Sequence, residues 1–345
     1  KITLAITYSG SPKGVNFTGI PLLLGWMNYG SGVFVASEPA GSAGWYPVND
    51  HPLDKATYSF HITVPEPFVV AANGLLEETT DNGDTTTYVW EMRQPMASYL
   101  TTVNIDDFVL RTDEGPGGLL IRNYFPTTIA DKAEIDFART GDMIAFFEEA
   151  FGPYPFEAYG VVVADQGFPF ALETQSLTLF ARDWITGDGS IEEAVAHELS
   201  HQWFGNSVSL SKWEDIWLNE GFATYSSWLW AEHDQGSDAL NQMVDQMVEY
   251  VSGSPDYFIA PGNPPANDLF NGGVYVRGGL TLHALRLTVG DETFFEIMST
   301  YYDRYQFSNA TTDDFIALSE EISGQDLGDL FDSWLYGEKL PALPE

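Results

Sequence analysis

The chain has 345 residues, of which 14 are Lys or Arg and 50 are Asp or Glu, so its formal net charge is −36 at pH 7. This charge repels phosphate backbones and anionic headgroups, which argues against nucleic acid as a partner. With 44% hydrophobic residues the chain can fill two cores, and its lack of cysteine excludes disulfides, thiol catalysis and cysteine-bound zinc. The acidic residues are scattered along the chain, often in adjacent pairs, which indicates that they keep the surface soluble. The alternative is that they attract the cationic N-termini of peptides.

Residues 1–112 are predicted to form a β-rich N-terminal domain. Short alternating runs at Thr57–Val64 and Thr85–Trp90 predict strands, and the D-N-G-D sequence at Asp81–Asp84 predicts a hairpin turn. Lys1–Tyr8 also alternate and predict a strand, with no signal peptide in front of it. The apolar runs are far shorter than the roughly 18 to 20 residues that span a bilayer, so we expect no membrane insertion.

Residues 113–345 are predicted to form a second domain that contains helices and a small sheet. The G-P-G-G sequence at Gly115–Gly118 marks a loop or the boundary between the domains. Periodicity predicts strands over Tyr159–Val163 and Thr174–Phe180, and helices over Ala130–Phe147, Leu240–Val251, Gly279–Val289 and Asp313–Ile322. The predicted fold class is therefore α+β.

An H-E-x-x-H string occupies His197–His201, and eighteen residues separate it from Glu220. On an α-helix the two histidines lie about 400° apart in rotation and about 6 Å apart in rise, so both imidazoles can bind one metal ion. Glu198, roughly 100° from His197, borders that face, where a carboxylate can hold a water beside the metal. Glu220 from a second helix completes a His2Glu set. Such a set leaves one position open, as catalytic zinc sites do, so we expect one Zn²⁺.

Local signals support a helix around this string. Ser190–Glu193 has the pattern of a capping box, and Gly205 provides a stop signal. An apolar stripe lies between them, formed by Ile191, Ala194, Val195 and Leu199. The other histidines have no partner at ligand spacing and are predicted to be surface or core residues, namely His51, His61, His233 and His283.

Two segments around the predicted metal site match a known pattern. His197–Asn206 reads H-E-L-S-H-Q-W-F-G-N and Trp217–Ala223 reads W-L-N-E-G-F-A. They resemble the aminopeptidase N and leukotriene-hydrolase family of gluzincin zinc peptidases. The resemblance extends over nearly the whole chain, through Trp45–Pro52, Lys55–Tyr58, Ser98–Leu100, Asp107–Phe108 and Phe151–Phe156. It implies a thermolysin-like catalytic domain behind a β-rich domain whose start is incomplete.

The resemblance also implies roles for two further residues. Glu173, in the A-L-E-T sequence of Ala171–Thr174, matches the glutamate with which the family binds the free α-amine of its substrate. Tyr275 matches the tyrosine that stabilises the tetrahedral intermediate, and Arg277 stands where lysine is common in the family.

The chain departs from the family pattern at several positions. Phe170 and Thr174 replace the glycine and asparagine that bracket the amine-binding glutamate. Ser227 stands where many relatives have a glutamate that orients the metal ligands, and His51 where many have an acidic residue. We assign the segment around His51 to packing between the domains.

Together these observations predict a zinc-dependent aminopeptidase that releases the N-terminal residue from peptides with a free N-terminus. Glu198 would act as general base and Tyr275 as donor to the developing oxyanion. One alternative is a zinc endopeptidase or other zinc hydrolase in which Glu173 has no role. Another is a non-catalytic binding protein. We expect an extracytoplasmic location, with the cytoplasm as the alternative.

Overall fold

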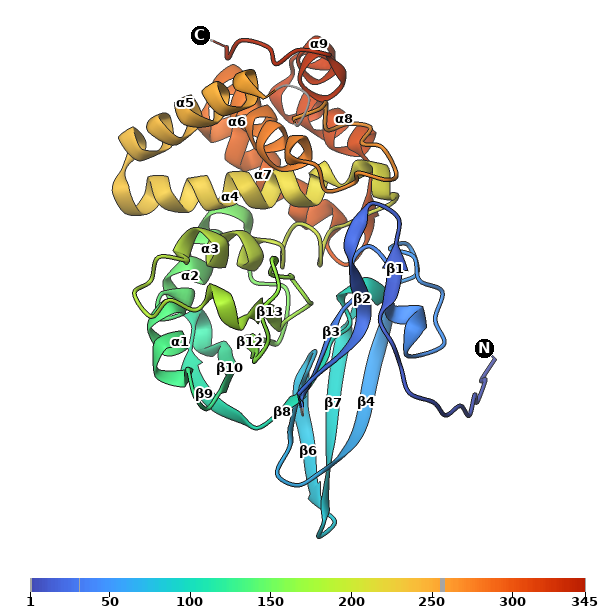
Figure 1. Ribbon diagram of the computed structural model, residues 1–345. Helices are drawn as coiled ribbons and strands as arrows, with labels where there is room; N and C mark the ends of the chain where they lie inside the picture. The colour runs from blue at the N-terminus through green and yellow to red at the C-terminus, as the bar shows by residue number, and fades with distance from the viewer. Residues whose placement is uncertain (1, 31, 255–257, 345) are drawn as a thin grey trace.

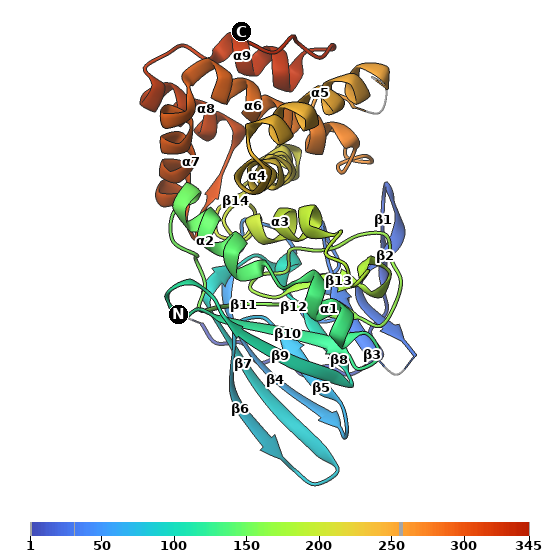
Figure 2. The ribbon, with the colours of Figure 1, turned by 90° about the vertical axis from the view of Figure 1, so that its left-hand side faces the viewer.

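The computed structural model describes residues 2–30, 32–254 and 258–344. A β-rich N-terminal domain, blue to cyan in Figure 1, is followed by a domain that combines a small sheet with helices. Figure 2 shows the strands at one end of the molecule and the later helices at the other, with the earlier helices between them. The predicted α+β class, with a β-rich domain first, is confirmed.

The described part of the N-terminal domain contains two antiparallel sheets. In one of them the strand order is β1 (Val15–Phe17), β2 (Ile20–Tyr29), β3 (Gly32–Ala36), β8 (Val103–Asp106) and β5 (Val69–Ala72). In the other, β7 lies between its neighbours, the order being β4 (Ala56–Pro65), β7 (Thr85–Met96) and β6 (Leu75–Asp81). The predicted strands at Thr57–Val64 and Thr85–Trp90 lie within β4 and β7, and the predicted turn joins β6 to β7. These predictions are confirmed.

The strand predicted at the start of the chain is wrong. Residues 2–8 have no regular secondary structure, and Ile2 and Leu4 are 90% and 80% exposed; Lys1 lies outside the described residues. An alternating pattern is not sufficient for a strand, because the backbone N–H and C=O groups also need a neighbouring strand.

The second domain begins with a sheet of strand order β11 (Ala158–Tyr159), β10 (Leu120–Pro126), β12 (Val161–Ala164) and β13 (Thr178–Ala181). The strand β9 (Phe108–Glu114) pairs with β10 over its whole length, and the boundary predicted at residue 112 falls inside it. We therefore propose that the second domain starts at Phe108. The predicted strand over Thr174–Phe180 is wrong in its first half, because residues 174–177 form turns before β13.

The rest of this domain consists mainly of helices, together with a short pair of parallel strands, β14 (Ser209–Leu210) and β15 (Asn309–Ala310). The helices are α1 (Ala130–Asp136), α2 (Thr140–Phe151), α3 (Glu192–Ser200), α4 (Trp217–Gln235), α5 (Ser237–Gly253), α6 (Gly278–Val289), α7 (Asp291–Tyr305), α8 (Thr312–Ser323) and α9 (Gly328–Phe331). The three later predicted helices coincide with α5, α6 and α8. The single helix predicted over Ala130–Phe147 is wrong, because the chain breaks between α1 and α2, where the Phe137 ring packs against Phe125 and Phe180.

The helix α4 is the centre of the second domain. It is buried along most of its length, and α3, α5 and α6 pack against it (Figure 1). A β-carbon at Gly221 of α4 would lie only 2.9 Å from the backbone of Gly278 in α6, so the two helices touch backbone to backbone. This close approach brings Glu220 near the π-helical turn Gly273–Arg277 that precedes α6.

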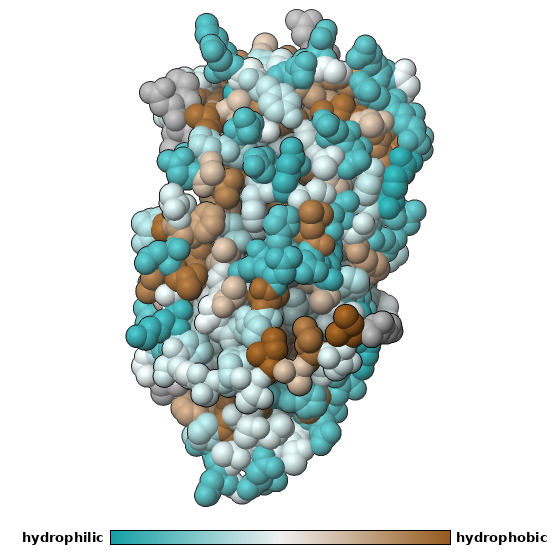
Figure 3. Space-filling model, turned by 90° about the vertical axis from the view of Figure 1, so that its right-hand side faces the viewer, coloured by the Kyte–Doolittle hydropathy of each residue, from teal (hydrophilic) through white to brown (hydrophobic). Residues whose placement is uncertain are grey.

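The surface carries polar side chains over both domains. Figure 3 shows hydrophilic residues spread across one face, with hydrophobic residues in small groups between them. Within residues 2–30, 32–254 and 258–344, none of the helices is both long and apolar enough for a bilayer crossing.

The remaining histidines lie on the surface or in the core, as predicted. His61 and His233 are exposed and His51 is half-buried. His283 is buried, and its Nδ1 lies 3.0 Å from the Tyr225 hydroxyl. Burial, followed by the nearby positive charge of Arg286, lowers the pKa of His283 to about 4.

His283 should weaken the fold in acid. Its pKa is near 6.5 in the unfolded chain. Between pH 6.5 and about 4 the unfolded chain therefore binds a proton that the folded chain does not, and stability falls as the pH is lowered through this window. At pH 5 the cost should be roughly 1–2 kcal/mol. His283→Gln should lose less stability than wild type between pH 7 and pH 5, measured by urea unfolding with excess chelator. An equal loss in both proteins would contradict the assignment.

Candidate metal centre and active site

The start of α3 differs from the predicted capping box. The helix begins at Glu192, and the Ser190 hydroxyl donates to Thr186 Oγ1 at 3.2 Å instead of capping the helix. The loop before α3 is held by Asp136 of α1, whose carboxylate accepts the backbone N–H groups of residues 186–189. A carboxylate far away in the sequence thus replaces the predicted local cap. The capping-box prediction is wrong.

Three predicted ligand atoms meet between α3 and α4. The Nε2 atoms of His197 and His201 lie 3.2 Å apart, and Glu220 Oε2 lies 3.3 Å from the first and 3.5 Å from the second. Glu220 lies in the first turn of α4, which packs against α3. Four ligands at 2.0–2.1 Å from a tetrahedral ion are about 3.3 Å apart, so these atoms form one face of such a site.

The sequence after α3 orients His201. Its Nδ1 lies 3.1 Å from the Phe204 carbonyl oxygen, which leaves Nε2 facing His197 and Glu220. Gly205 follows with φ +129°, and a β-carbon there would lie 3.2 Å from His201 Nδ1. The glycine predicted as a helix stop therefore also makes room for an imidazole.

Glu198 lies beside this ligand set, because one of its carboxylate oxygens and atoms of His201 and Glu173 lie within 4.8 Å of one another. It is buried, and within the described residues its Oε2 has no hydrogen-bond partner. Burial raises the pKa of its carboxyl well above the usual range; His201 opposes this rise, and the carboxylates of Glu173 and Glu220 add to it. Glu198 is thus a proton-accepting group that faces a cavity.

Glu173 lies just before β13 in a segment that the metal-binding motif holds in place. Its carbonyl oxygen accepts hydrogen bonds from Gln202 Nε2 at 3.1 Å and Asn206 Nδ2 at 2.6 Å, and Gln202 Oε1 accepts the Ser176 N–H at 2.8 Å. Thr174, a departure from the family pattern, donates its hydroxyl to the Leu177 carbonyl. Two side chains that follow the H-E-x-x-H string thereby position Glu173.

The Glu173 carboxylate itself is buried. Its Oε1 lacks a hydrogen-bond partner in the described part of the chain. Burial raises its pKa to about 7, with His201 opposing the rise and Glu220 adding to it. This carboxylate oxygen can therefore accept a hydrogen bond from a cationic or other proton-donating group.

Glu38 is a site residue that the sequence analysis missed. It follows β3 in the N-terminal domain, and carboxylate oxygens of Glu38, Glu173 and Glu220 lie within 4.8 Å of one another. Burial and these neighbours raise its pKa well above the usual range. In the sequence, Ser37–Pro39 reads as an ordinary turn, so no local signal could have identified it.

Tyr275 reaches the same place from the π-helical turn before α6. Its ring lies 6.2 Å from the His197 ring, nearly parallel to it, and burial raises the pKa of its hydroxyl. Arg277 points away to the C-terminal segment, where it donates to the carbonyl oxygens of Trp334, Ser333 and Gly337. Arg277 is therefore a packing residue.

A cavity of about 570 Å³ joins these groups. All the predicted site residues line it, namely Glu173, His197, Glu198, His201, Glu220 and Tyr275. Glu38 lines it as well. Ser227 also lines it, and its hydroxyl donates to the Thr224 carbonyl at 2.8 Å.

Comparison with known proteins agrees with this architecture. Residues 135–334 match the peptidase family M1 domain, and residues 26–100 match the peptidase M1 N-terminal domain. The chain belongs to peptidase family M1. This confirms the family resemblance found in the sequence motifs.

Several members of family M1 are similar to the chain. Aminopeptidase M1 of Arabidopsis thaliana is 26% identical over 329 residues, which cover 89% of this chain and 37% of that protein. Glutamyl aminopeptidase of Homo sapiens is 29% identical over 329 residues, which cover 89% of this chain and 34% of that protein. The chain thus spans little more than a third of the length of these aminopeptidases.

Solved structures of family M1 superpose closely. The M1 zinc metallopeptidase from Deinococcus radiodurans is 32% identical with a TM-score of 0.88, and the match covers 97% of this chain and 76% of that one. A mutant of that enzyme has been solved with a Tyr-Ser-Ala substrate. Yeast LTA4 hydrolase, at 22% identity and a TM-score of 0.79, shares the fold.

Proposed function

We propose that this chain is a zinc-dependent aminopeptidase that hydrolyses the first peptide bond of peptides with a free N-terminus. One observation carries the proposal: the His2Glu set shares a cavity with two carboxylates, Glu38 and Glu173, that come from different domains and lie beside it. A metal set alone fits any zinc hydrolase. The adjacent carboxylates fit an ammonium group and so favour an exopeptidase.

His197, His201 and Glu220 would hold the zinc ion. Their donor atoms are the nitrogen and oxygen ligands that zinc prefers, and their separations of 3.2, 3.3 and 3.5 Å fit one face of a tetrahedron. When bound, zinc acidifies water and polarises a carbonyl group. The Phe204 carbonyl oxygen, 3.1 Å from His201 Nδ1, would orient this ligand.

Glu198 and Tyr275 would act on the scissile bond. Glu198 takes a proton from the attacking water and returns it to the leaving amine, a role that its raised pKa suits. Tyr275 stays protonated at neutral pH, because burial raises its pKa, and can donate its hydroxyl hydrogen to the developing oxyanion.

Glu38 and Glu173 would bind the substrate ammonium. An ammonium between the two carboxylates satisfies the free Oε1 atoms that both carry among the described residues. Because these carboxylates lie beside Glu220, the bond presented to the metal centre is the first one. The aminopeptidase names of the relatives and the substrate-bound Deinococcus enzyme support this function.

The metal assignment predicts the behaviour of ligand variants. His201→Ala and Glu220→Ala should each weaken zinc binding by at least about 100-fold, because each removes a direct ligand. Competition with a chromophoric chelator measures the affinity, and elemental analysis after dialysis measures the zinc content. His233→Ala, an exposed histidine, is the matched control and should keep one zinc per chain. Unchanged affinity in a ligand variant would remove that residue from the set.

The general-base assignment predicts a separation of binding from turnover. Glu198→Gln keeps the shape of the side chain but cannot take up a proton, so kcat should fall by about 100-fold or more. Zinc content should stay at the wild-type level. A variant that retains both zinc and near-normal kcat would show that another group accepts the proton.

The exopeptidase assignment predicts the preference for free amines. Wild type should cleave aminoacyl amides far faster than their N-acetylated forms. Glu173→Ala should lose roughly 30- to 1000-fold in kcat/KM on the free-amine substrates, while the acetylated ones stay equally poor. Glu149→Ala, at an exposed position on α2, changes the charge equally and should behave as wild type. If wild type cleaves both substrate types alike, the protein is an endopeptidase.

A further inference from the structure

A second cavity of about 290 Å³ opens from the metal-centre cavity. The two cavities share four lining residues, namely Glu38, Phe170, Ala171 and Tyr275. The second cavity therefore begins at the place where the substrate ammonium would lie. A side chain on the same substrate residue would point into it.

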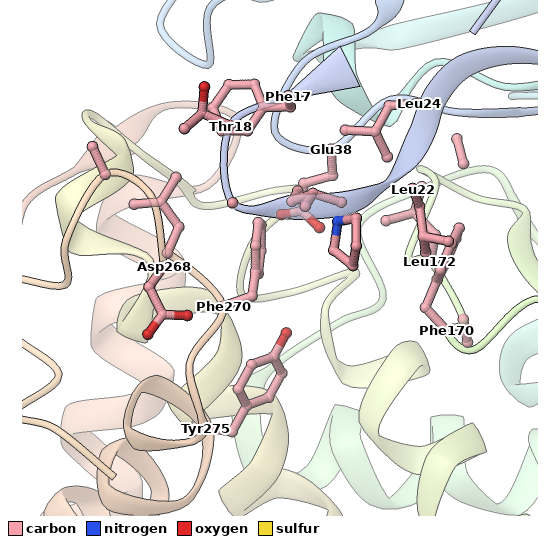
Figure 4. A pocket seen from close by; sticks show the side chains of 17 residues that line it. Phe17, Thr18, Leu22, Leu24, Glu38, Phe170, Leu172, Asp268, Phe270 and Tyr275 are labelled. Atoms are coloured by element: carbon pink, nitrogen blue, oxygen red, sulfur yellow. The ribbon is translucent and has the colours of Figure 1, made fainter. Parts of the chain in front are cut away.

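The walls of the second cavity are mainly apolar and come from both domains. Leu22 and Leu24 belong to β2, Phe170 and Leu172 to the segment before β13, and Leu269 and Phe270 to the loop before the π-helical turn. Figure 4 shows Phe270 on one side of Glu38, Phe170 and Leu172 on the other, and the Tyr275 hydroxyl pointing toward this group. Among its described lining residues the only ionisable carboxyls are Glu38, at the mouth, and Asp268, which is exposed.

The hairpin between β1 and β2 forms one wall of the cavity. It extends from the N-terminal domain toward the helices (Figure 1). At its tip Gly19 has φ +87°, and a β-carbon there would lie 2.0 Å from the Asn267 carbonyl oxygen, so the tip touches the catalytic-domain loop. Ligand pockets usually measure about 300–1,000 Å³, so this small cavity suits one large side chain and not a peptide.

We infer that this cavity binds the side chain of the first substrate residue and selects large apolar side chains such as Leu, Met, Phe and Tyr. The inference rests on the proposed aminopeptidase function. Apolar side chains gain from leaving water for apolar walls. A Lys or Arg head group would lose its hydration there, with Glu38 already paired with the α-ammonium, and an Asp or Glu would be repelled by Glu38.

A panel of unblocked aminoacyl amides tests the selectivity. Leu and Phe amides should have kcat/KM at least about 10-fold above Ala amide, and also above Lys, Arg and Glu amides. If Ala, Lys or Arg amides are cleaved fastest, the inference is overturned while the proposed function stands. If none of the free-amine substrates is cleaved, the proposed function fails and the inference fails with it.

Neighbouring residues of β2 provide a matched pair of variants. Leu22 lines the cavity, whereas Leu23 is 45% exposed and does not. Leu22→Asp should raise the ratio of kcat/KM for Lys over Leu amide by at least about 10-fold, because it places a carboxylate in the wall. Leu23→Asp should leave that ratio unchanged.

Leu22→Phe is a second test that does not depend on a buried charge. The larger ring fills part of the cavity, so kcat/KM should fall at least about 10-fold for Phe amide and little for Ala amide. Thermal melting confirms that each variant is folded. The inference is overturned if the substrate ratios of both Leu22 variants equal those of wild type, or if Leu23→Asp shifts them as much as Leu22→Asp.

Discussion

The removal of several carboxylates from water around one cavity is the constraint on which the rest of this structure depends. Glu38, Glu173, Glu198 and Glu220 line one cavity, where the low dielectric strengthens every charge interaction. Burial raises the pKa of Glu38 and of Glu198 well above the usual range, and neighbouring carboxylates add to the rise. Burial lowers the pKa of His201, but Glu220, Glu173 and Glu198 outweigh this effect and raise it to about 10. Such a cluster attracts cations. A divalent metal and a substrate ammonium are the two cations that the proposed function supplies.

Holding these carboxylates together requires contacts between the domains. Lys55 of β4's preceding segment donates its ammonium hydrogens to the carbonyl oxygens of Asn206, Ser207 and Ser308, next to the end of the metal-binding motif. Tyr99 accepts a hydrogen bond from Asn219, the neighbour of Glu220, at 3.3 Å. Both residues lie in the N-terminal segments that resembled the family. These contacts therefore fix the position of the second domain against the first, which carries Glu38.

The features that could be predicted from the sequence are those that depend on a local pattern of residues. The two histidine ligands could be predicted from the sequence because helical spacing alone brings His197 and His201 to one face. The strands β4 and β7 could be predicted because their alternating segments do pair with each other in the structure. The break after α1 and the contacts that hold the start of α3 could not be predicted from the sequence. Both depend on residues that are distant in the sequence. Asp136 binds the loop before α3, and Phe180 packs against Phe137 at the break after α1. Glu38 reaches the site only through domain packing, which leaves no periodic signal.

The division of the cavity between two domains explains how cleavage could be limited to one residue. An endopeptidase needs a groove open on both sides of its metal. Here the metal-centre cavity meets Glu38 and Glu173 on one side, and beyond them the β1–β2 hairpin touches the loop at Asn267. A longer chain on that side would have to bury its backbone polar groups against apolar walls and push the hairpin aside. A single side chain carries no such cost. Under the proposed function, the same hairpin would therefore restrict the length of the substrate on this side and offer an apolar surface for selectivity.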